Sequence, residues 1–187
     1  VSLLQLIQKI CTNNIQKLYD GKIQYSCMLN EDGGCLDDLL VYRFSNNHYM
    51  LVVNASNAET DFEWIQSHNN MGCEVINQTS SRALLALQGP KSKFVLQALT
   101  DINLDNIPYY SFQIGVVAGC PGVIVSNTGY TGSGGFELYL DEKWSKKIWS
   151  ELFSISDILK PIGLAARDTL RLEMGYCLYG NDIDSNR

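Results

Sequence analysis

The sequence predicts an α+β fold of two sub-domains, residues 1–79 and 80–187. Segments that alternate between apolar and polar residues occur in both halves, next to stretches with helical periodicity. The pattern of hairpins followed by helices restarts near residue 80, which is typical of α+β units with antiparallel or mixed sheets. Because no low-complexity linker separates the halves, we expect them to pack tightly.

The first sub-domain is expected to begin with a helix and to continue with a small sheet. The turn NEDGG joins two of its strands, and we expect Gly33 and Gly34 to supply positive φ there. Asn54 or Ser56 could cap the helix that follows. The predicted elements are helices over 2–19 and 57–69, and strands over 23–29, 35–44, 49–54 and 73–78.

The second sub-domain repeats strands and helices in a different order. Pro90 suits the first turn of a helix, and glycines near 175–180 mark the end of the last one. The predicted elements are strands over 82–89, 111–119, 122–129 and 135–140, and helices over 90–99, 143–154 and 163–177.

Composition narrows the class of protein. Hydrophobic residues make up 45% of the 187 residues, and the net charge is -6, so an acidic surface argues against nucleic acid as a partner. No apolar run is long enough to span a bilayer, and no signal-peptide pattern is present, so we expect no membrane association. The abrupt start without Met and the lack of a closing element suggest a piece of a longer protein.

The six cysteines form no C-x-x-C pair, which argues against a zinc ribbon or a thioredoxin-type motif. They lie in apolar runs, as buried free thiols do, and therefore indicate a reducing compartment. We expect no metal site. The presence of only two histidines also argues against a Ser-His-Asp triad as the basis of catalysis.

The glycine-rich stretch SNTGYTGSGGFELYL, residues 126–140, does not have the spacing of a phosphate loop and leads into a strand. It is either a wide β-hairpin turn or a turn that approaches a flat ligand, with Tyr130 as a stacking face. Glu137 lies between apolar neighbours in the strand, where a buried carboxylate needs a partner. That partner is either Arg167 or the donor edge of a ligand, and spacing alone does not choose.

Adjacent aspartates in CLDDLLVYRF must point to opposite faces of their strand. If Leu36, Leu40 and Tyr42 face inward, the inward carboxylate is Asp38. An inward aspartate in an apolar strand is either a satisfied structural group or a functional one.

These features occur together in long blocks that resemble the aminomethyltransferase family, the T-protein of the glycine cleavage system. The resemblance covers essentially the whole chain. Its blocks are GKIQYSCMLNEDGGCLDDLLVYRFSNNHYMLVVNASNAETDFEWI, ALLALQGPKS, YYSF, NTGYTGSGGFELYL and GLAARDTLRLEMGYCLYGNDID.

The resemblance implies a tetrahydrofolate-dependent transferase of glycine catabolism and one-carbon metabolism. The aminomethyl group on the lipoyl arm of H-protein would pass to tetrahydrofolate, giving 5,10-methylenetetrahydrofolate, ammonia and dihydrolipoyl H-protein. The family fold is a three-domain ring with a central folate channel and a C-terminal barrel-like domain, which we expect to lie outside this chain. We therefore expect the chain alone to be inactive. The location would be cytoplasmic in a bacterium and the mitochondrial matrix in a eukaryote.

The resemblance also assigns site residues one by one. Asp38 matches the catalytic aspartate, and Glu137 and Arg167 match folate-binding positions. The glycine loop would bring Tyr130 close to the folate. Further pocket-lining positions are matched by Tyr25, Tyr42, Asn54 and Tyr110.

One departure and three alternatives accompany this interpretation. The family often has TGYTGEDGFE where this chain has TGYTGSGGFE, so Ser133 and Gly134 change the charge and stiffness of the loop. The chain could instead be the folate domain of a dimethylglycine or sarcosine dehydrogenase fusion. A non-catalytic folate-binding protein of iron–sulfur assembly is disfavoured, because MGYCLYGND lacks the Lys, Gln and Glu of the block K-G-C-x-x-G-Q-E. A pseudoenzyme is disfavoured because Asp38, Glu137 and Arg167 are all present.

Overall fold

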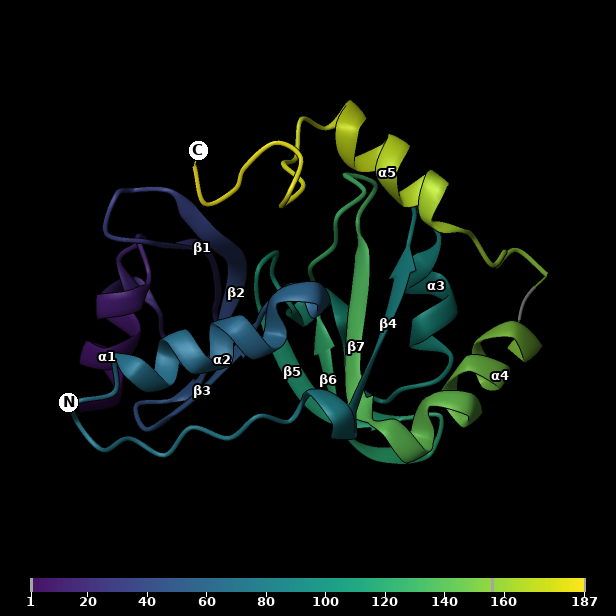
Figure 1. Cartoon of the computed structure of the whole chain (residues 1–187). Coiled ribbons are helices and arrows are strands. Elements are labelled where there is room, and N and C mark those ends of the chain that lie inside the picture. The colour runs from purple at the N-terminus through teal and green to yellow at the C-terminus, as the bar shows by residue number, and fades with distance from the viewer. Residues whose placement is uncertain (1, 156, 187) are drawn as a thin grey trace. The chain divides into compact units, whose positions relative to one another are not determined.

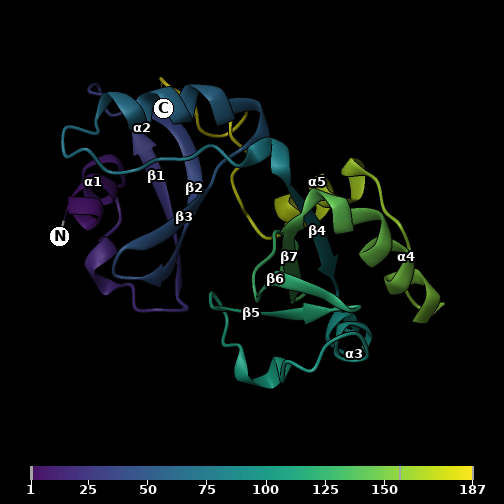
Figure 2. The same cartoon turned by 90° about the horizontal axis from the view of Figure 1, so that it is seen from below.

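The computed structural model describes residues 2–155 and 157–186 as an α+β chain with two antiparallel sheets (Figure 1; Figure 2). The chain divides into two compact units. The first unit comprises the described residues up to Asn77 together with those from Cys177 onward. The second unit is Gln78–Tyr176. The predicted fold class is confirmed.

The first unit is a three-stranded sheet with two helices on one face. Its strands are β1 (Ile23–Leu29), β2 (Cys35–Ser45) and β3 (His48–Val52), in the order β1-β2-β3. Its helices are α1 (Ser2–Ile10) and α2 (Ala58–Ser67), with 3-10 turns at Ile15–Lys17 and Ala55–Asn57. Leu39 and Val41 of β2 are buried against Ile7 of α1 and Ile65 of α2, so both helices cover the same face (Figure 1).

The first helix is shorter than the expected 2–19. It ends at Ile10 because the next residues bond elsewhere: the Thr12 N–H donates to the carbonyl of Cys27 at 3.0 Å. The side chain of Asn14 then accepts from the Gln16 N–H at 3.0 Å and caps a separate 3-10 turn. Side chains such as that of Asn14 compete with the helix in this way.

The strand expected over 73–78 is wrong. This segment has no ladder partner among the described residues and is an irregular connection. Its start is held by Asn69, whose side chain accepts from the Cys73 N–H at 2.9 Å and donates to the Cys73 carbonyl at 2.6 Å. Val75 packs against the core of the first unit, which explains its apolar character without a strand.

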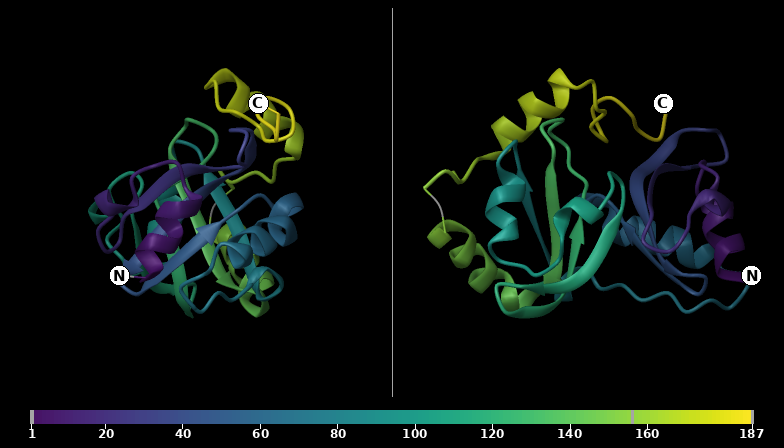
Figure 3. Two further views of the ribbon diagram at one scale, coloured as in Figure 1. Left: turned by 60° about the vertical axis from the view of Figure 1, so that its left-hand side comes forward. Right: turned by 180° about the vertical axis from the view of Figure 1, so that it is seen from behind.

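The second unit is a four-stranded sheet in the order β4-β7-β6-β5. The helices α3 and α4 contribute Val95, Leu96, Ile148 and Leu152 to the core on one face of this sheet (Figure 3). The strands are β4 (Arg82–Gln88), β5 (Phe112–Val117), β6 (Cys120–Ser126) and β7 (Gly135–Asp141), and the helices are α3 (Ser92–Gln97), α4 (Ser145–Ile155) and α5 (Leu164–Glu173). Short 3-10 turns occupy Thr79–Ser81, Leu104–Asn106 and Glu142–Trp144.

The C-terminal segment from Cys177 onward groups with the first unit, whereas the predicted sub-domain 80–187 placed it with the second. The reason is backbone hydrogen bonding: the Cys35 N–H donates to the Asp184 carbonyl at 2.8 Å. The amide of Asn30 donates to the Ser185 carbonyl at 2.9 Å.

Gly34 has no positive φ, contrary to expectation. It is glycine because a Cβ there would lie 1.8 Å from the Ser185 oxygen.

The six cysteines are all free thiols. Cys11, Cys35 and Cys120 are buried, but Cys177 is exposed, unlike the buried position expected for it. Over the residues that the structure describes, no helix has both the length and the apolar character needed to cross a membrane.

Candidate functional site

The two adjacent aspartates of β2 lie on opposite faces, but the inward one is Asp37 rather than Asp38. Asp37 is 0% exposed and shares its face with the core residues Leu39 and Val41. Asp38 is only partly buried and lies with Leu36 and Leu40 on the other face. The prediction of the inward carboxylate was wrong because the helices cover the Leu39–Val41 face. Asp38 is therefore the more accessible of the two carboxylates.

Asn54 connects both aspartates. Its side-chain amide donates to Oδ1 of Asp37 at 2.7 Å and to Oδ1 of Asp38 at 2.8 Å, and its backbone N–H donates to Oδ2 of Asp37 at 2.9 Å. Asn54 does precede a 3-10 turn, but its side chain makes no capping bond there. The fixed amide holds the Asp38 carboxylate in one orientation.

Tyr25 is the second donor to Asp38. Its hydroxyl donates to Oδ2 of Asp38 at 2.9 Å, and the residue is 41% exposed. Burial, followed by the charge of Asp38, raises the pKa of the Tyr25 phenol, so it stays a hydrogen donor at neutral pH. Tyr42, which the resemblance places in the pocket, is fully buried. Tyr25, Asp38 and Asn54 thus form one hydrogen-bonded group within the first unit.

Glu137 occupies the face of β7 that points away from the core of the second unit. Phe136 and Leu138 enter that core, and Glu137 between them is only partly buried. The Thr128 hydroxyl donates to Oε2 of Glu137, and the Ser126 and Thr128 hydroxyls are themselves 2.7 Å apart. Burial raises the pKa of Glu137, whereas Thr128 and the charge of Arg167 oppose that rise.

Arg167 stacks on Tyr130 instead of pairing directly with Glu137. Its guanidinium carbon lies 4.3 Å from the centroid of the Tyr130 ring, a cation–π distance. The ion pairs formed within the described residues do not include Arg167 or Glu137. The Tyr130 ring also stacks with Tyr176, with centroids 5.7 Å apart. The direct Glu137–Arg167 bridge considered from the sequence is therefore not formed. Arg167 of α5 instead lies over the ring of Tyr130.

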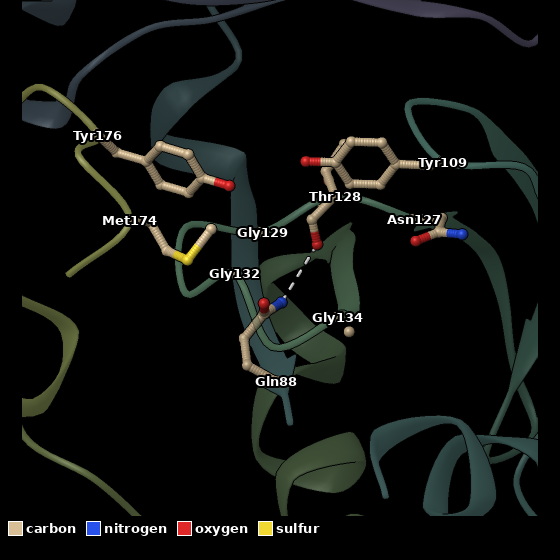
Figure 4. Close-up of a pocket in the computed structure, with 10 residues that line it drawn as sticks. Gln88, Tyr109, Asn127, Thr128, Gly129, Gly132, Gly134, Met174 and Tyr176 are labelled. Carbon is tan, nitrogen blue, oxygen red and sulfur yellow. Dashed lines mark hydrogen bonds between the residues drawn. The ribbon is translucent and has the colours of Figure 1, made fainter. Parts of the chain in front are cut away.

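The glycine loop between β6 and β7 is a wide hairpin connection that borders a cavity of about 130 Å³ (Figure 4). Gln88 closes the base of the loop. Its amide donates to the carbonyls of Thr128 and Phe136, each at 3.2 Å, and its oxygen accepts from the Thr131 hydroxyl at 3.1 Å. A Cβ on Gly129 would lie 1.9 Å from that oxygen, so glycine there allows the loop to pack on Gln88.

Two tyrosines reach toward each other across this cavity. Tyr109 and Tyr176 extend from opposite sides in Figure 4, and burial, followed by the interaction with the Tyr176 phenol, raises the pKa of Tyr109. Tyr110, the position expected to line the pocket, contacts Tyr109 edge-on at 4.8 Å. Tyr110 has φ 59°, an uncommon value for a residue other than glycine. Its N–H is held by the Asn127 carbonyl at 3.0 Å.

Sequence reasoning missed several residues of this site, namely Gln88, Asn127, Thr128, Met174 and Tyr176. Thr128 could have been predicted, because a partly buried carboxylate in a strand needs a hydrogen-bond donor, and the segment after the adjacent strand can supply one. Gln88 and Tyr176 gave none, since their partners are distant in sequence. Among the residues described, no group of three His, Cys, Asp or Glu side chains could hold a metal ion.

Comparison with known proteins agrees with this structure. The chain matches the GCVT N-terminal domain over residues 3–187. Proteins named aminomethyltransferase from Flavobacterium psychrophilum and Bacteroides fragilis are 58% and 57% identical to it over 183 residues. Each match covers 97% of this chain and 51% of the relative, so the chain spans about half the length of these curated relatives.

Solved structures show the same fold. The crystal structure of glycine cleavage system aminomethyltransferase T from Bartonella henselae matches with a TM-score of 0.88 and 33% identity, covering 100% of this chain and 50% of that one. Heterotetrameric sarcosine oxidase from Corynebacterium sp. U-96 matches with a TM-score of 0.53 and 14% identity, covering 82% and 67%, and shares only the fold. The chain therefore belongs to the GCVT N-terminal domain family, as its resemblance to the glycine cleavage T-protein indicated.

Proposed function

We propose that the complete protein transfers the aminomethyl group from lipoylated H-protein to tetrahydrofolate. The observation that carries this proposal is the 58% identity to a relative named aminomethyltransferase, which extends over 97% of the chain. In the reaction, the carbon–sulfur and carbon–nitrogen bonds of the aminomethyl thioether break and two bonds to folate nitrogens form. Ammonia and the dihydrolipoyl thiol leave, and no oxidant is needed.

Glu137 is the proposed acceptor for the donor-rich edge of the pterin ring. A carboxylate offers about four acceptor sites. The Thr128 hydroxyl occupies one, and a bond involving Tyr139 accounts for another, so acceptor capacity remains for a ligand. Paired donors to a carboxylate bind strongly and with defined geometry. These contacts support Glu137 as a folate-binding residue.

Tyr130 and Arg167 are proposed to bind the same ligand through its flat ring and its charge. The Arg167 guanidinium lies over the Tyr130 ring and forms no direct ion pair with the carboxylates that the structure describes, so aromatic surface and a positive charge lie side by side. Such a surface suits a planar ring that carries an anionic tail. The cavity beside the glycine loop, lined by Tyr109 and Tyr176, is a further place for ring contacts in the second unit (Figure 4).

Asp38 is the proposed catalytic residue. The transferred carbon is already activated as an aminomethyl thioether, so the protein needs no nucleophile of its own. The remaining task is to hold the folate nitrogens and to move their protons as ammonia leaves, which a carboxylate performs by charge and hydrogen bonding. Asp38 suits this role because it is partly exposed and held by Tyr25 and Asn54.

The test is an assay of the complete protein with aminomethylated H-protein and tetrahydrofolate, following methylenetetrahydrofolate and ammonia. We expect both products in equal amounts. Formation of methylenetetrahydrofolate from dimethylglycine or sarcosine, but not from the H-protein adduct, would replace this function by that of a dehydrogenase-linked folate domain.

The named relatives are bacterial, so we place the protein in the cytoplasm.

A further inference from the structure

A second buried carboxyl group lies beside Asp37. Asp61 belongs to the first turn of α2 and is 1% exposed. Its Oδ2 has no hydrogen-bond partner among the described residues, and its side chain interacts with Asp37. The ion pairs found within residues 2–155 and 157–186 include neither of these carboxyl groups. The two acids therefore face each other in the core without a cation between them.

Only one of the two acids can be ionised at low cost. Two carboxylates in contact in an apolar interior repel each other and lose hydration, so such a pair keeps one proton. Asp37 is the ionised partner, because its oxygens accept from the Asn54 N–H, the Asn54 amide and the Asn57 amide at 2.7–2.9 Å. Asp61 then holds the proton and donates it toward Asp37.

We propose that Asp61 is a positioning residue whose acid proton holds Asp37 in place. Asp37 in turn fixes the amide of Asn54, and this amide orients the Asp38 carboxylate. The chain of contacts therefore runs from the core side of the sheet to its other face. The inference rests on the function proposed above, since it gives Asp61 an effect on turnover through Asp38.

The electrostatic surroundings agree with this assignment. Burial, followed by the hydrogen bond to Asp37 and its charge, raises the pKa of Asp61 to about 8. Cys35 of β2 feels the charge of Asp37, and burial is the main reason that its pKa is raised to about 12. Tyr179 of the C-terminal segment has a raised pKa through burial and then through the charges of Asp37, Cys35, Asp61 and Asp184. Within this cluster Asp61 is the group expected to change charge near pH 8.

The first experiment compares the complete protein with its Asp61→Asn variant between pH 6 and 9.5. The Asn amide can still donate to Asp37, so we expect kcat at pH 7 to stay within about twofold of the wild type. Wild-type kcat should fall above about pH 8, when Asp61 loses its proton, and the variant should show no such fall. Identical pH profiles of the two proteins would overturn the inference.

The second experiment removes the donor. Asp61→Leu keeps the branched shape of the side chain but cannot donate, so kcat at pH 7 should fall by about tenfold or more while KM for tetrahydrofolate changes less than about twofold. Glu63→Gln, an exposed position on the same helix, is the matched control and should be silent. An Asp61→Leu variant with wild-type kcat would contradict the positioning role.

A third measurement does not depend on turnover. The side-chain amide NMR signals of Asn54 in the complete protein should shift with a midpoint near pH 8 in the wild type and stay constant in Asp61→Asn. Signals that are insensitive to pH in the wild type would sink the inference, even if Asp61→Leu does not fold. Failure of the proposed function would look different: the wild type would form no methylenetetrahydrofolate, whereas the Asn54 signals would still titrate.

Discussion

The phenolic hydroxyl of Tyr25 donates a hydrogen bond of 2.9 Å to Oδ2 of Asp38. The Asn54 amide occupies the other oxygen, so this partly exposed carboxylate is held from two sides. The arrangement favours a group that works in one orientation and takes part in proton transfer.

Asp38→Asn in the complete protein is expected to lower turnover by about a hundredfold or more, since general acid–base groups contribute about 10²–10⁴-fold. Affinity for tetrahydrofolate and H-protein should change little, because Asn keeps the size and one acceptor. Initial rates of methylenetetrahydrofolate formation measure the effect. Asp32→Asn, an exposed site in the turn after β1, is the control. An Asp38→Asn protein with normal turnover would show that Asp38 is not the catalytic residue.

Asp37→Asn should destabilise the protein, because Asp37 and not Asp38 is the inward carboxylate. Asp37 is fully buried and accepts from Asn54 and Asn57, so an amide there replaces one acceptor oxygen by a donor that faces existing donors. The expected loss is about 1–3 kcal/mol in the free energy of unfolding, typical of a buried group left without its partner. Urea denaturation provides the measurement, and a variant as stable as the wild type would refute the expectation.

Glu137→Gln should weaken tetrahydrofolate binding by about 2–3 kcal/mol, because a donor would then face the donor edge of the pterin. The Thr128 hydroxyl can still donate to the amide oxygen, so thermal stability should change much less than binding. Calorimetric titration and a melting curve on the same protein separate the two effects. Unchanged affinity would show that Glu137 does not bind tetrahydrofolate.

Folate binding should weaken as the pH falls. Burial raises the pKa of Glu137 above its ordinary value of 4.5, and only the ionised carboxylate accepts from two ligand donors. Affinity is therefore expected to be full at neutral pH and to be lost on acidification, with a midpoint above 4.5. Titrations of the wild type and of Glu137→Gln over the same buffers test this, because the variant lacks the titrating group. Parallel curves would mean that another group is responsible.

Gly129→Ala tests the packing of the glycine loop. The new Cβ would lie 1.9 Å from Oε1 of Gln88, so the loop or Gln88 must move, at a cost of about 1–3 kcal/mol in unfolding free energy. In a Gln88→Ala background the same substitution should cost clearly less, since the obstacle is gone. Equal costs in both backgrounds would show that loop strain, and not this contact, requires glycine.

The strands were predictable from sequence because alternation and turn residues are local signals. β1, β2 and β7 lie within a residue of the predicted ranges, since NEDGG and the residues before Gly135 mark their ends. The face of β2 was not predictable. Both faces of this strand carry apolar side chains, so only the placement of α1 and α2 shows that Leu39 and Val41 form the core.

The site was predictable residue by residue only where a long motif carried it. Asn54 was expected to cap a helix, and its use as a clamp on Asp37 and Asp38 depends on strand pairing that the sequence does not reveal. Gln88 lies 40 residues from its partner Thr128, a separation that no local pattern encodes. Asp61 looked like an ordinary first-turn acid of a helix, because its burial comes from tertiary packing.

The return of the chain at Cys177 has a consequence for biosynthesis. Because Gln78–Tyr176 is continuous and the other unit needs residues from both sides of it, the protein emerges from the ribosome as an interrupted unit with a whole one inserted. The inserted unit can complete its contacts first, whereas Cys35 must wait about 150 residues for the carbonyl of Asp184. Of these two units, therefore, the one whose synthesis begins first is the one completed last.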